Sequence, residues 1–405
     1  MSEPLLVIGN GMASARFVDE LASRALGRYA VAVVGEEPQL AYNRVLLSSV
    51  LAGAVPMSGI ELKPPKWWTD RGVTLLYGQR AVAIDHAIRR VRLEGGATLP
   101  YRHLVLATGS KPIRLPVPGN HLSGVMTFRD LGDVSALLAA AVKGANAVVI
   151  GGGLLGLEAA YGLARAGVNV AIVHLMDCLM ERQLDGRAAA MLKMAIEKQG
   201  VRVHLGAQTA AIRGLRRVEA VELADGHVLP ADLVVMAVGI RPNVDLAASA
   251  GLNVNRGVVV DDGLQTSLAG IYAIGECAEH RGACYGLVEP AYEQAQVLAQ
   301  RLVGGGDASY AGNVLATNLK VSGVHVFSAG DFLGSARANE IVFFDPGLGI
   351  YKRLVIDGDR LVGAVLYGDT ADGLWYLDLI RSGASIKGIR DNLAFGRALA
   401  ARKAA

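Results

Sequence analysis

Short apolar runs alternate with helical periodicity over the first 35 residues. Residues 5–8 are all apolar, as in a strand buried on both faces of a parallel sheet. Phe17, Leu21 and Ala25 then recur at every fourth position, which places them on one face of a helix. A second apolar run follows at 31–34. This order predicts a β-α-β unit.

The same pattern restarts in the middle of the chain. An apolar run at 147–150 precedes a predicted helix over 154–166, and another run follows at 170–173. A helix is then predicted over 184–198, with a strand at 201–205 and a β-meander that extends to 238. The chain therefore holds a second unit of the same design.

The remaining segments complete the predicted architecture. They give a hairpin around Gly95-Gly96, buried strands at 104–107 and 271–274, a helix after 276, strands at 354–356 and 361–366, and a helix at 373–381. Pro112, Pro116, Pro118 and Gly119 mark a boundary. We predict an α/β fold with two Rossmann-like dinucleotide-binding domains, 1–111 with 239–308 and 112–238, and a C-terminal α+β interface domain, 309–405.

Composition, charge and cysteine spacing argue against several classes of function. The 405 residues carry a formal net charge of +3 and no basic run interleaved with aromatics, so we expect no nucleic-acid partner. Cys178, Cys277 and Cys284 lack metal-ligand spacing and do not form an even set, so neither a metal site nor a disulfide scaffold is expected. With no apolar stretch of about 18 residues and no signal-peptide pattern, we expect a cytoplasmic protein that does not contact the membrane.

The first glycine turn, Gly9-Asn10-Gly11-Met12-Ala13-Ser14, follows a strand and opens a helix. In such a turn the first glycine permits the bend, the second lets the backbone approach a pyrophosphate, and the third position must be small. The helix N-terminus offers N–H groups to the phosphates. Glu36 or Glu37, at the end of the next strand, would accept hydrogen bonds from a ribose. The alternative for one turn alone is a simple β–α connection.

The second turn, Gly151-Gly152-Gly153-Leu154-Leu155-Gly156, has glycine at all three positions, and Glu158 follows it. The strand-end position that often carries an acid is His174. An acid repels the 2′-phosphate of NADPH whereas a protonated histidine tolerates it, so NADH and NADPH both stay open. A histidine without any ligand contact is the alternative.

Three further segments fit a bound flavin. Polar groups of Tyr42-Asn43-Arg44 and Ser48-Ser49 could reach the pyrophosphate and the ring edge. Ala107-Thr108-Gly109-Ser110 is a small-residue turn after a buried strand, and Gly275-Glu276 closes another strand, where the carboxylate could accept from ribitol hydroxyls.

Together these residues resemble the two-dinucleotide flavoprotein reductases, the group of rubredoxin and ferredoxin reductases. More narrowly, the chain is similar to the flavin-containing N-terminal part of the large subunit of bacterial NADH-dependent nitrite reductase. The narrow resemblance rests on Gly9-Asn10-Gly11-Met12-Ala13, Tyr42-Asn43-Arg44-Val45-Leu46-Leu47-Ser48, His174-Leu175-Met176, Met180-Glu181-Arg182-Gln183-Leu184-Asp185, Gly275-Glu276-Cys277-Ala278-Glu279-His280 and Tyr367-Gly368-Asp369-Thr370.

The resemblance implies FAD in the first domain, NADH or NADPH in the second, and a C-terminal module near the flavin. Carried over by position, the flavin contacts would be Gly9, Gly11, Ala13, Glu36, Arg44, Val82, Thr108, Gly109, Arg129, Glu276 and Val288. The nicotinamide contacts would be Gly151, Gly153, Leu155, Gly156, Glu158 and Gly239. Because hydride transfer is the cofactors' own chemistry, no acid–base triad is expected. Glu158 is the candidate catalytic residue, positioning the nicotinamide, and Val288-Glu289-Pro290 would flank the ring.

The chain departs from these relatives in two ways. Many ferredoxin reductases carry a lysine where this chain has Ser49, and that lysine pairs with the glutamate matching Glu158. That edge of the flavin is therefore expected to be less positive here. Full nitrite reductase large subunits continue into iron–sulfur and sirohaem segments, so we expect that these 405 residues alone do not reduce nitrite.

The expected function is electron transfer from NAD(P)H through FAD to an iron–sulfur protein, a rubredoxin-like protein or a nitrate or nitrite reductase subunit. Residues 40–55 contain no cysteine, which argues against disulfide reduction. An NAD(P)H oxidase using oxygen and a nucleotide-sensing interaction protein are the alternatives. The basic segment 379–405 either steers an acidic acceptor or is a solvated tail. A homodimer is left open.

Overall fold

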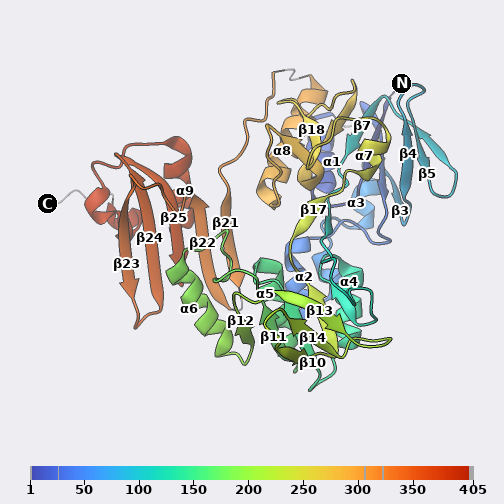
Figure 1. Cartoon of the computed structure of the whole chain (residues 1–405). Helices are drawn as coiled ribbons and strands as arrows, with labels where there is room; N and C mark the ends of the chain where they lie inside the picture. The colour runs from blue at the N-terminus through green and yellow to red at the C-terminus, as the bar shows by residue number, and fades with distance from the viewer. Residues whose placement is uncertain (1, 26, 305–306, 322, 401–405) are drawn as a thin grey trace.

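The computed structural model describes residues 2–25, 27–304, 307–321 and 323–400. Within these ranges, three five-stranded sheets form the cores of three units (Figure 1). Arg402 and Lys403, from the basic C-terminal segment, lie outside the described residues. The predicted α/β fold class is confirmed.

The first unit is built on a parallel sheet with the strand order β19-β7-β1-β2-β3. Its strands are β1 (Glu3–Ile8), β2 (Tyr29–Gly35), β3 (Thr74–Tyr77), β7 (His103–Leu106) and β19 (Ile271–Ala273). β19 pairs with β7, so a segment from far along the chain completes the sheet. Helices α1 (Met12–Ala25) and α8 (Val288–Val303) pack against one another, and Phe17 and Leu21 lie on the buried face of α1.

Smaller elements surround this sheet. The predicted hairpin at Gly95-Gly96 is the turn between β5 (Arg90–Leu93) and β6 (Thr98–Pro100), which extend β4 (Ala81–Asp85). The others are η1 (Arg44–Leu46), α2 (Leu47–Leu51), η2 (Met57–Ile60), α3 (Pro65–Thr69), α7 (Asp245–Ser249), β18 (Val258–Val260), η3 (Gly275–Cys277) and β20 (Ala278–His280).

The second unit has a parallel sheet with the order β12-β11-β10-β16-β9. Its strands are β9 (Val125–Thr127), β10 (Asn146–Ile150), β11 (Asn169–Val173), β12 (Arg202–His204) and β16 (Leu233–Met236). Its helices are α4 (Leu131–Ala140), α5 (Leu154–Arg165) and α6 (Gly186–Glu197). The predicted meander is β13 (Thr209–Arg213), β14 (Ala220–Leu223) and β15 (Val228–Pro230), but it ends before 238, because β16 pairs parallel with β10 and β9 instead.

Two connections join these units. β8 (Ser110–Pro112) leaves the first unit and β17 (Ile240–Pro242) returns to it, and the two pair antiparallel. The chain therefore crosses between the units twice at one place. The exact boundaries, 111/112, 238/239 and 308/309, stay predictions.

The C-terminal unit is an antiparallel sheet with the order β21-β22-β25-β24-β23. Its strands are β21 (Ala316–Val321), β22 (Val324–Gly330), β23 (Asn339–Asp345), β24 (Ile350–Asp357) and β25 (Arg360–Tyr367), followed by α9 (Gly373–Ser382), η4 (Arg390–Phe395) and α10 (Arg397–Ala400). The sheet stands beside α6, and Tyr351 and Tyr367 join the core of the second unit (Figure 1).

Candidate active site

A continuous cavity of about 2090 Å³ is lined by all three units. Both glycine turns, the segments after β2 and β11, and residues of β21 and β22 contribute to its wall. In parallel α/β sheets the carboxyl ends of the strands are the usual place for ligands. The cavity therefore brings the two predicted dinucleotide sites into one space.

The first glycine turn leaves open space where a phosphate needs it. Gly9 has φ +113°, and a Cβ there would lie 2.0 Å from the Ala107 carbonyl oxygen. A Cβ on Gly11 would meet no heavy atom within 4 Å. The backbone at Gly11 is thus accessible from the cavity, at the N-terminus of α1. This cradle fits the pyrophosphate of a dinucleotide.

The second turn repeats this construction. Gly151 has φ +117°, and a Cβ there would lie 2.3 Å from the Ala237 carbonyl oxygen. Gly153, like Gly11, has open space at its Cβ position. A Cβ on Gly156 would lie 2.0 Å from the Gly151 carbonyl oxygen, so helix and turn pack too closely for a side chain. The residues of this turn also fit a pyrophosphate.

A polar network surrounds Arg44 in the first unit. Its Nη2 forms an ion pair with Glu37, and its Nη1 donates to the Tyr42 hydroxyl (2.9 Å) and the Arg129 carbonyl (3.1 Å). The Tyr42 hydroxyl donates to Glu37 Oε2 at 2.6 Å, and burial raises the pKa of this tyrosine. Glu36 also lines the cavity, with its carboxylate 3.7 Å from Arg80 Nε. Both candidate ribose acids therefore reach the wall.

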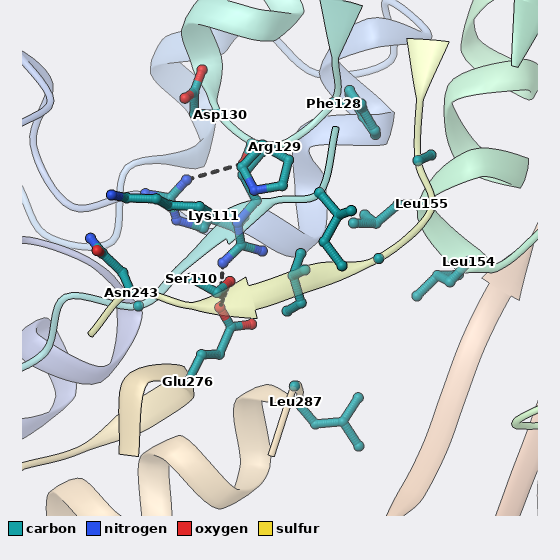
Figure 2. Close-up of a pocket in the computed structure, with 18 of the residues that line it drawn as sticks. Ser110, Lys111, Phe128, Arg129, Asp130, Leu154, Leu155, Asn243, Glu276 and Leu287 are labelled. Atoms are coloured by element: carbon teal, nitrogen blue, oxygen red, sulfur yellow. Dashed lines mark hydrogen bonds and ion pairs between the residues drawn. The ribbon is translucent and has the colours of Figure 1, made fainter. Parts of the chain in front are cut away.

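Arg129 and Glu276 meet across the two units. The Arg129 guanidinium forms an ion pair with Glu276, whose Oε2 also accepts a hydrogen bond from Ser110 Oγ at 2.7 Å. Figure 2 shows the two side chains pointing toward one another, with Leu154 and Leu155 on a different side of the same space. This arrangement places a cation and an anion on the cavity wall.

Glu158 reaches the cavity from the first turns of α5. Burial raises the pKa of its carboxyl group to about 7, and a hydrogen bond with Ser48 opposes part of this effect. No ion pair of Glu158 is found among the described residues. Ser49, the position of the lysine in related reductases, lies in α2 and is not on the cavity wall.

His174 is buried at the end of β11, with 8% of its surface exposed. Its Nδ1 accepts a hydrogen bond from the Gly152 N–H at 3.0 Å, and its Nε2 lies 3.1 Å from Glu181 Oε2. The histidine therefore has two partners within the protein, and its contact with a nucleotide stays a prediction.

Most of the predicted cofactor-binding residues lie on this cavity. They are Gly9, Gly11, Ala13, Glu36, Arg44, Val82, Ala107, Thr108, Gly109, Arg129, Gly151, Gly153, Leu155, Glu158, His174, Gly239, Gly275, Glu276, Val288 and Glu289. Ser14, Ser49 and Gly156 are not on its wall: Ser14 is fully buried on the inner face of α1, and Gly156 packs on Gly151. All of these residues stay predictions as cofactor contacts.

Several residues of the wall were not among the predicted cofactor contacts, notably Glu181, Arg182, Asn243 and Phe332. Glu181 and Arg182 stand in a loop without periodicity, so only the fold shows that they face the cavity. In the described ranges, no group of three or more His, Cys, Asp or Glu side chains could hold a metal ion. No helix in those ranges has the length and apolar character of a membrane span.

Comparison with known proteins identifies the family. Residues 3–300 match the pyridine nucleotide-disulphide oxidoreductase family, and residues 316–384 match the rubredoxin NAD+ reductase C-terminal domain. The chain belongs to the pyridine nucleotide-disulphide oxidoreductase family. FAD and a nicotinamide nucleotide are accordingly its cofactors, as predicted, and the two cradles fit them.

Individual relatives agree with this assignment. The chain is 47% identical over 382 residues to a nitrite reductase [NAD(P)H] of Bacillus subtilis (strain 168), covering 94% of this chain and 48% of the relative. It is 41% identical over 374 residues to the assimilatory nitrate reductase electron transfer subunit of the same organism, covering 92% of this chain and 48% of the relative. The chain thus spans about half the length of these relatives.

A solved structure matches the whole chain. The crystal structure of the covalent putidaredoxin reductase–putidaredoxin complex contains a chain with a TM-score of 0.87 and 25% identity, and the match covers 99% of both chains. The predicted resemblance to the ferredoxin and rubredoxin reductase group is confirmed.

Proposed function

We propose that this protein passes electrons from a reduced nicotinamide nucleotide, through FAD, to a protein acceptor of the iron–sulfur or rubredoxin-like type. The observation that carries the proposal is the single cavity that contains both glycine turns. Two separate sites would hold two dinucleotides without bringing their rings together. A shared cavity is the arrangement that hydride transfer between two ring systems needs.

Different residues of the cavity wall are assigned to the two nucleotides. On the flavin side we assign the Gly9–Gly11 turn, Arg44, Arg129 and Glu276, and on the nicotinamide side the Gly151–Gly153 turn and Glu158. Arg44 and Arg129 bring positive charge that suits a pyrophosphate. FAD held by these residues would supply a hydride acceptor for the reduced nicotinamide and a donor of single electrons to the acceptor protein.

Apolar side chains complete the enclosure. Leu155 from α5, Leu287 before α8 and Phe332 of the C-terminal unit lie on the wall from three directions. Their role in this proposal is to exclude water from the reacting rings, which suppresses loss of the hydride to side reactions. Because burial raises its pKa to about 7, Glu158 would hold a proton below that pH and would then offer a hydrogen bond to the nicotinamide rather than a negative charge.

The cysteines favour a protein acceptor over a disulfide substrate. Cys277 is fully buried, and its thiol contacts the carbonyl oxygens of Leu106 and Ile274. Burial raises the pKa of the thiols of Cys277 and Cys284, which keeps both in the unreactive protonated form. We further propose that the protein works in the cytoplasm and serves nitrate or nitrite assimilation, in keeping with the names of its relatives.

Anaerobic stopped-flow spectroscopy of the FAD-loaded protein tests this function. Mixing with NADH or NADPH is expected to bleach the flavin absorbance rapidly, and an added [2Fe–2S] ferredoxin or rubredoxin is expected to restore it. Slow or absent bleaching would contradict the proposal. Restoration by air but by neither iron–sulfur protein would instead indicate an oxidase.

A further inference from the structure

Both backbone groups of Gly152 are bound by the segment that follows β11. The Gly152 N–H donates to His174 Nδ1 at 3.0 Å, and the Gly152 carbonyl accepts from the Met180 N–H at 3.0 Å. A Cβ on Gly152 would lie 2.7 Å from both the His174 ring and Leu179 Cδ2. Segment 174–181 is thus packed directly onto the second glycine turn.

These contacts determine the hydrogen positions on His174. Because Nδ1 accepts from an N–H group, it carries no hydrogen of its own, and the single ring hydrogen is on Nε2. That N–H then donates to Glu181 Oε2, 3.1 Å away. In this state the histidine is uncharged, and its polar atoms are both occupied. It offers no positive charge to a ligand.

The backbone around His174 is equally restrained. Its N–H donates to the His204 carbonyl, and its own carbonyl accepts from the Ala207 N–H, both at 2.9 Å. Glu181 follows directly after Met180, whose N–H holds the Gly152 carbonyl. His174 and Glu181 both line the cavity that contains the glycine turn. The carboxylate is therefore presented beside the turn from a rigid support.

We propose that Glu181, oriented by His174, is the acid that receives the adenosine ribose hydroxyls of the nicotinamide nucleotide, so that the protein selects NADH over NADPH. The inference rests on the proposed function, whose electron donor it names. In most dinucleotide-binding domains, an acid at the end of the second strand accepts these hydrogen bonds from the ribose. Here a residue seven positions later supplies the carboxylate, and the strand-end histidine positions it. A 2′-phosphate would meet the negative charge of Glu181.

Arg182 is a nearby positive charge that would favour NADPH instead. It also lines the cavity, and a guanidinium can hold a 2′-phosphate. Glu181, however, has the hydrogen bond to His174 that fixes its place, whereas no hydrogen bond of the Arg182 side chain is found within the described residues. The geometry therefore favours the carboxylate as the group that decides specificity.

The experiment measures binding rather than turnover. Isothermal titration calorimetry of the FAD-loaded protein with ADP-ribose and with 2′-phospho-ADP-ribose reports on this site without any redox step. The wild-type protein is expected to bind ADP-ribose more tightly. Glu181→Gln keeps an acceptor for His174 but removes the charge, and should shift the ratio of the two dissociation constants toward the phosphorylated probe by about tenfold to a hundredfold.

Asp177→Asn is the matched control, because Asp177 is an exposed acid of the same loop that does not line the cavity. It should leave the ratio unchanged. A wild-type preference for 2′-phospho-ADP-ribose, or an equal shift in both variants, would overturn the proposal.

His174→Phe tests the positioning role. The ratio of the two dissociation constants should move in the same direction as in Glu181→Gln. Equal weakening of both probes would show a merely structural histidine. Failure of flavin bleaching would leave these binding results intact.

Discussion

At the scale of single residues, Glu158 is a carboxyl group without a cation beside it in the described part of the chain. The resemblance to ferredoxin reductases implies a lysine at the position of Ser49, whereas here the carboxyl group has Ser48 as its hydrogen-bond partner. Burial without a compensating charge favours the neutral acid. The raised pKa of Glu158 on α5 thus accompanies a neutral serine, not a cation, on the facing part of α2.

The raised pKa of Glu158 should be visible in the pH dependence of the unfolding free energy. The pKa of Glu158 is raised from an ordinary 4.5 to about 7, so the folded state holds the proton more tightly than the unfolded state. Its contribution to stability is fully present below pH 4.5 and is lost as the pH rises through 7. Glu158→Gln, which cannot ionise, should match the wild type at pH 4 and exceed its unfolding free energy by about 3 kcal/mol at pH 8.

Urea denaturation of the cofactor-free protein at both pH values provides the measurement. The exposed Glu219→Gln is the control and should change the unfolding free energy by less than about 0.5 kcal/mol at either pH. If Glu158→Gln were as sensitive to pH as the wild type, the carboxyl group would be ionised in the folded protein.

At the scale of elements, the two glycine turns show that one motif meets two physical demands. Gly9 and Gly151 adopt positive φ, and a Cβ on either would clash with the carbonyl oxygen of Ala107 or Ala237, respectively. The fold therefore requires glycine at both positions. Gly11 and Gly153 face open space, so the fold itself does not require glycine there, and we propose that a bound nucleotide does. The first demand concerns stability, and the second concerns binding.

Alanine substitutions in the second turn should separate these demands. Gly153→Ala adds a methyl group to the cavity, where no atom lies within 4 Å, and should change stability by less than about 1 kcal/mol. It should nevertheless abolish tight ADP-ribose binding. Gly156→Ala places a Cβ 2.0 Å from the Gly151 carbonyl oxygen and should destabilise the fold by about 2 kcal/mol or more.

Thermal unfolding and calorimetric titration of the two variants distinguish these effects. Normal ADP-ribose binding by Gly153→Ala would show that the cavity at this turn is not the nucleotide site. A loss of stability larger than about 1 kcal/mol would show that the space beside Gly153 is not free for a methyl group.

At the scale of the whole molecule, the C-terminal unit closes the cavity and is held by contacts with the second unit. The Tyr351 hydroxyl of β24 donates to Asp185 Oδ2 at 2.7 Å, just before α6, and both residues are buried. Burial raises the pKa of Tyr351, and the hydrogen bond to Asp185 adds to this effect. The Tyr367 hydroxyl of β25 donates to the Met191 carbonyl at 3.2 Å.

Removal of one hydroxyl should loosen this attachment. Tyr351→Phe leaves the buried Asp185 carboxylate without its donor and is expected to cost about 1 to 3 kcal/mol. Hydrogen exchange in β24 and α6 should accelerate accordingly. Tyr367→Phe is the matched control: its acceptor is a neutral carbonyl at a longer distance, so its effect should be the smaller one. The reverse order would contradict the role assigned to Asp185.

The amino-acid sequence alone determined the parts of this protein whose physics is local. A glycine turn between an apolar strand and an amphipathic helix depends only on neighbouring residues of the sequence. For this reason both dinucleotide units, the fold class and the family could be predicted. The helices α5 and α6 follow the predicted segments to within two residues. In the C-terminal unit, β21, β22 and β23 were not predicted. Along β23, exposed and partly buried positions alternate at the sheet edge without a fully buried face.

Only the tertiary structure decided which distant residues meet. Arg129 and Glu276 lie 147 positions apart in the sequence and form an ion pair because two separate units face one cavity. Glu181 stands in an irregular loop, where no periodicity indicates direction, and it reaches the second glycine turn only because Met180 and His174 bind Gly152. Local backbone geometry is encoded by neighbours in the chain, whereas charge placement across a cavity depends on how the units pack.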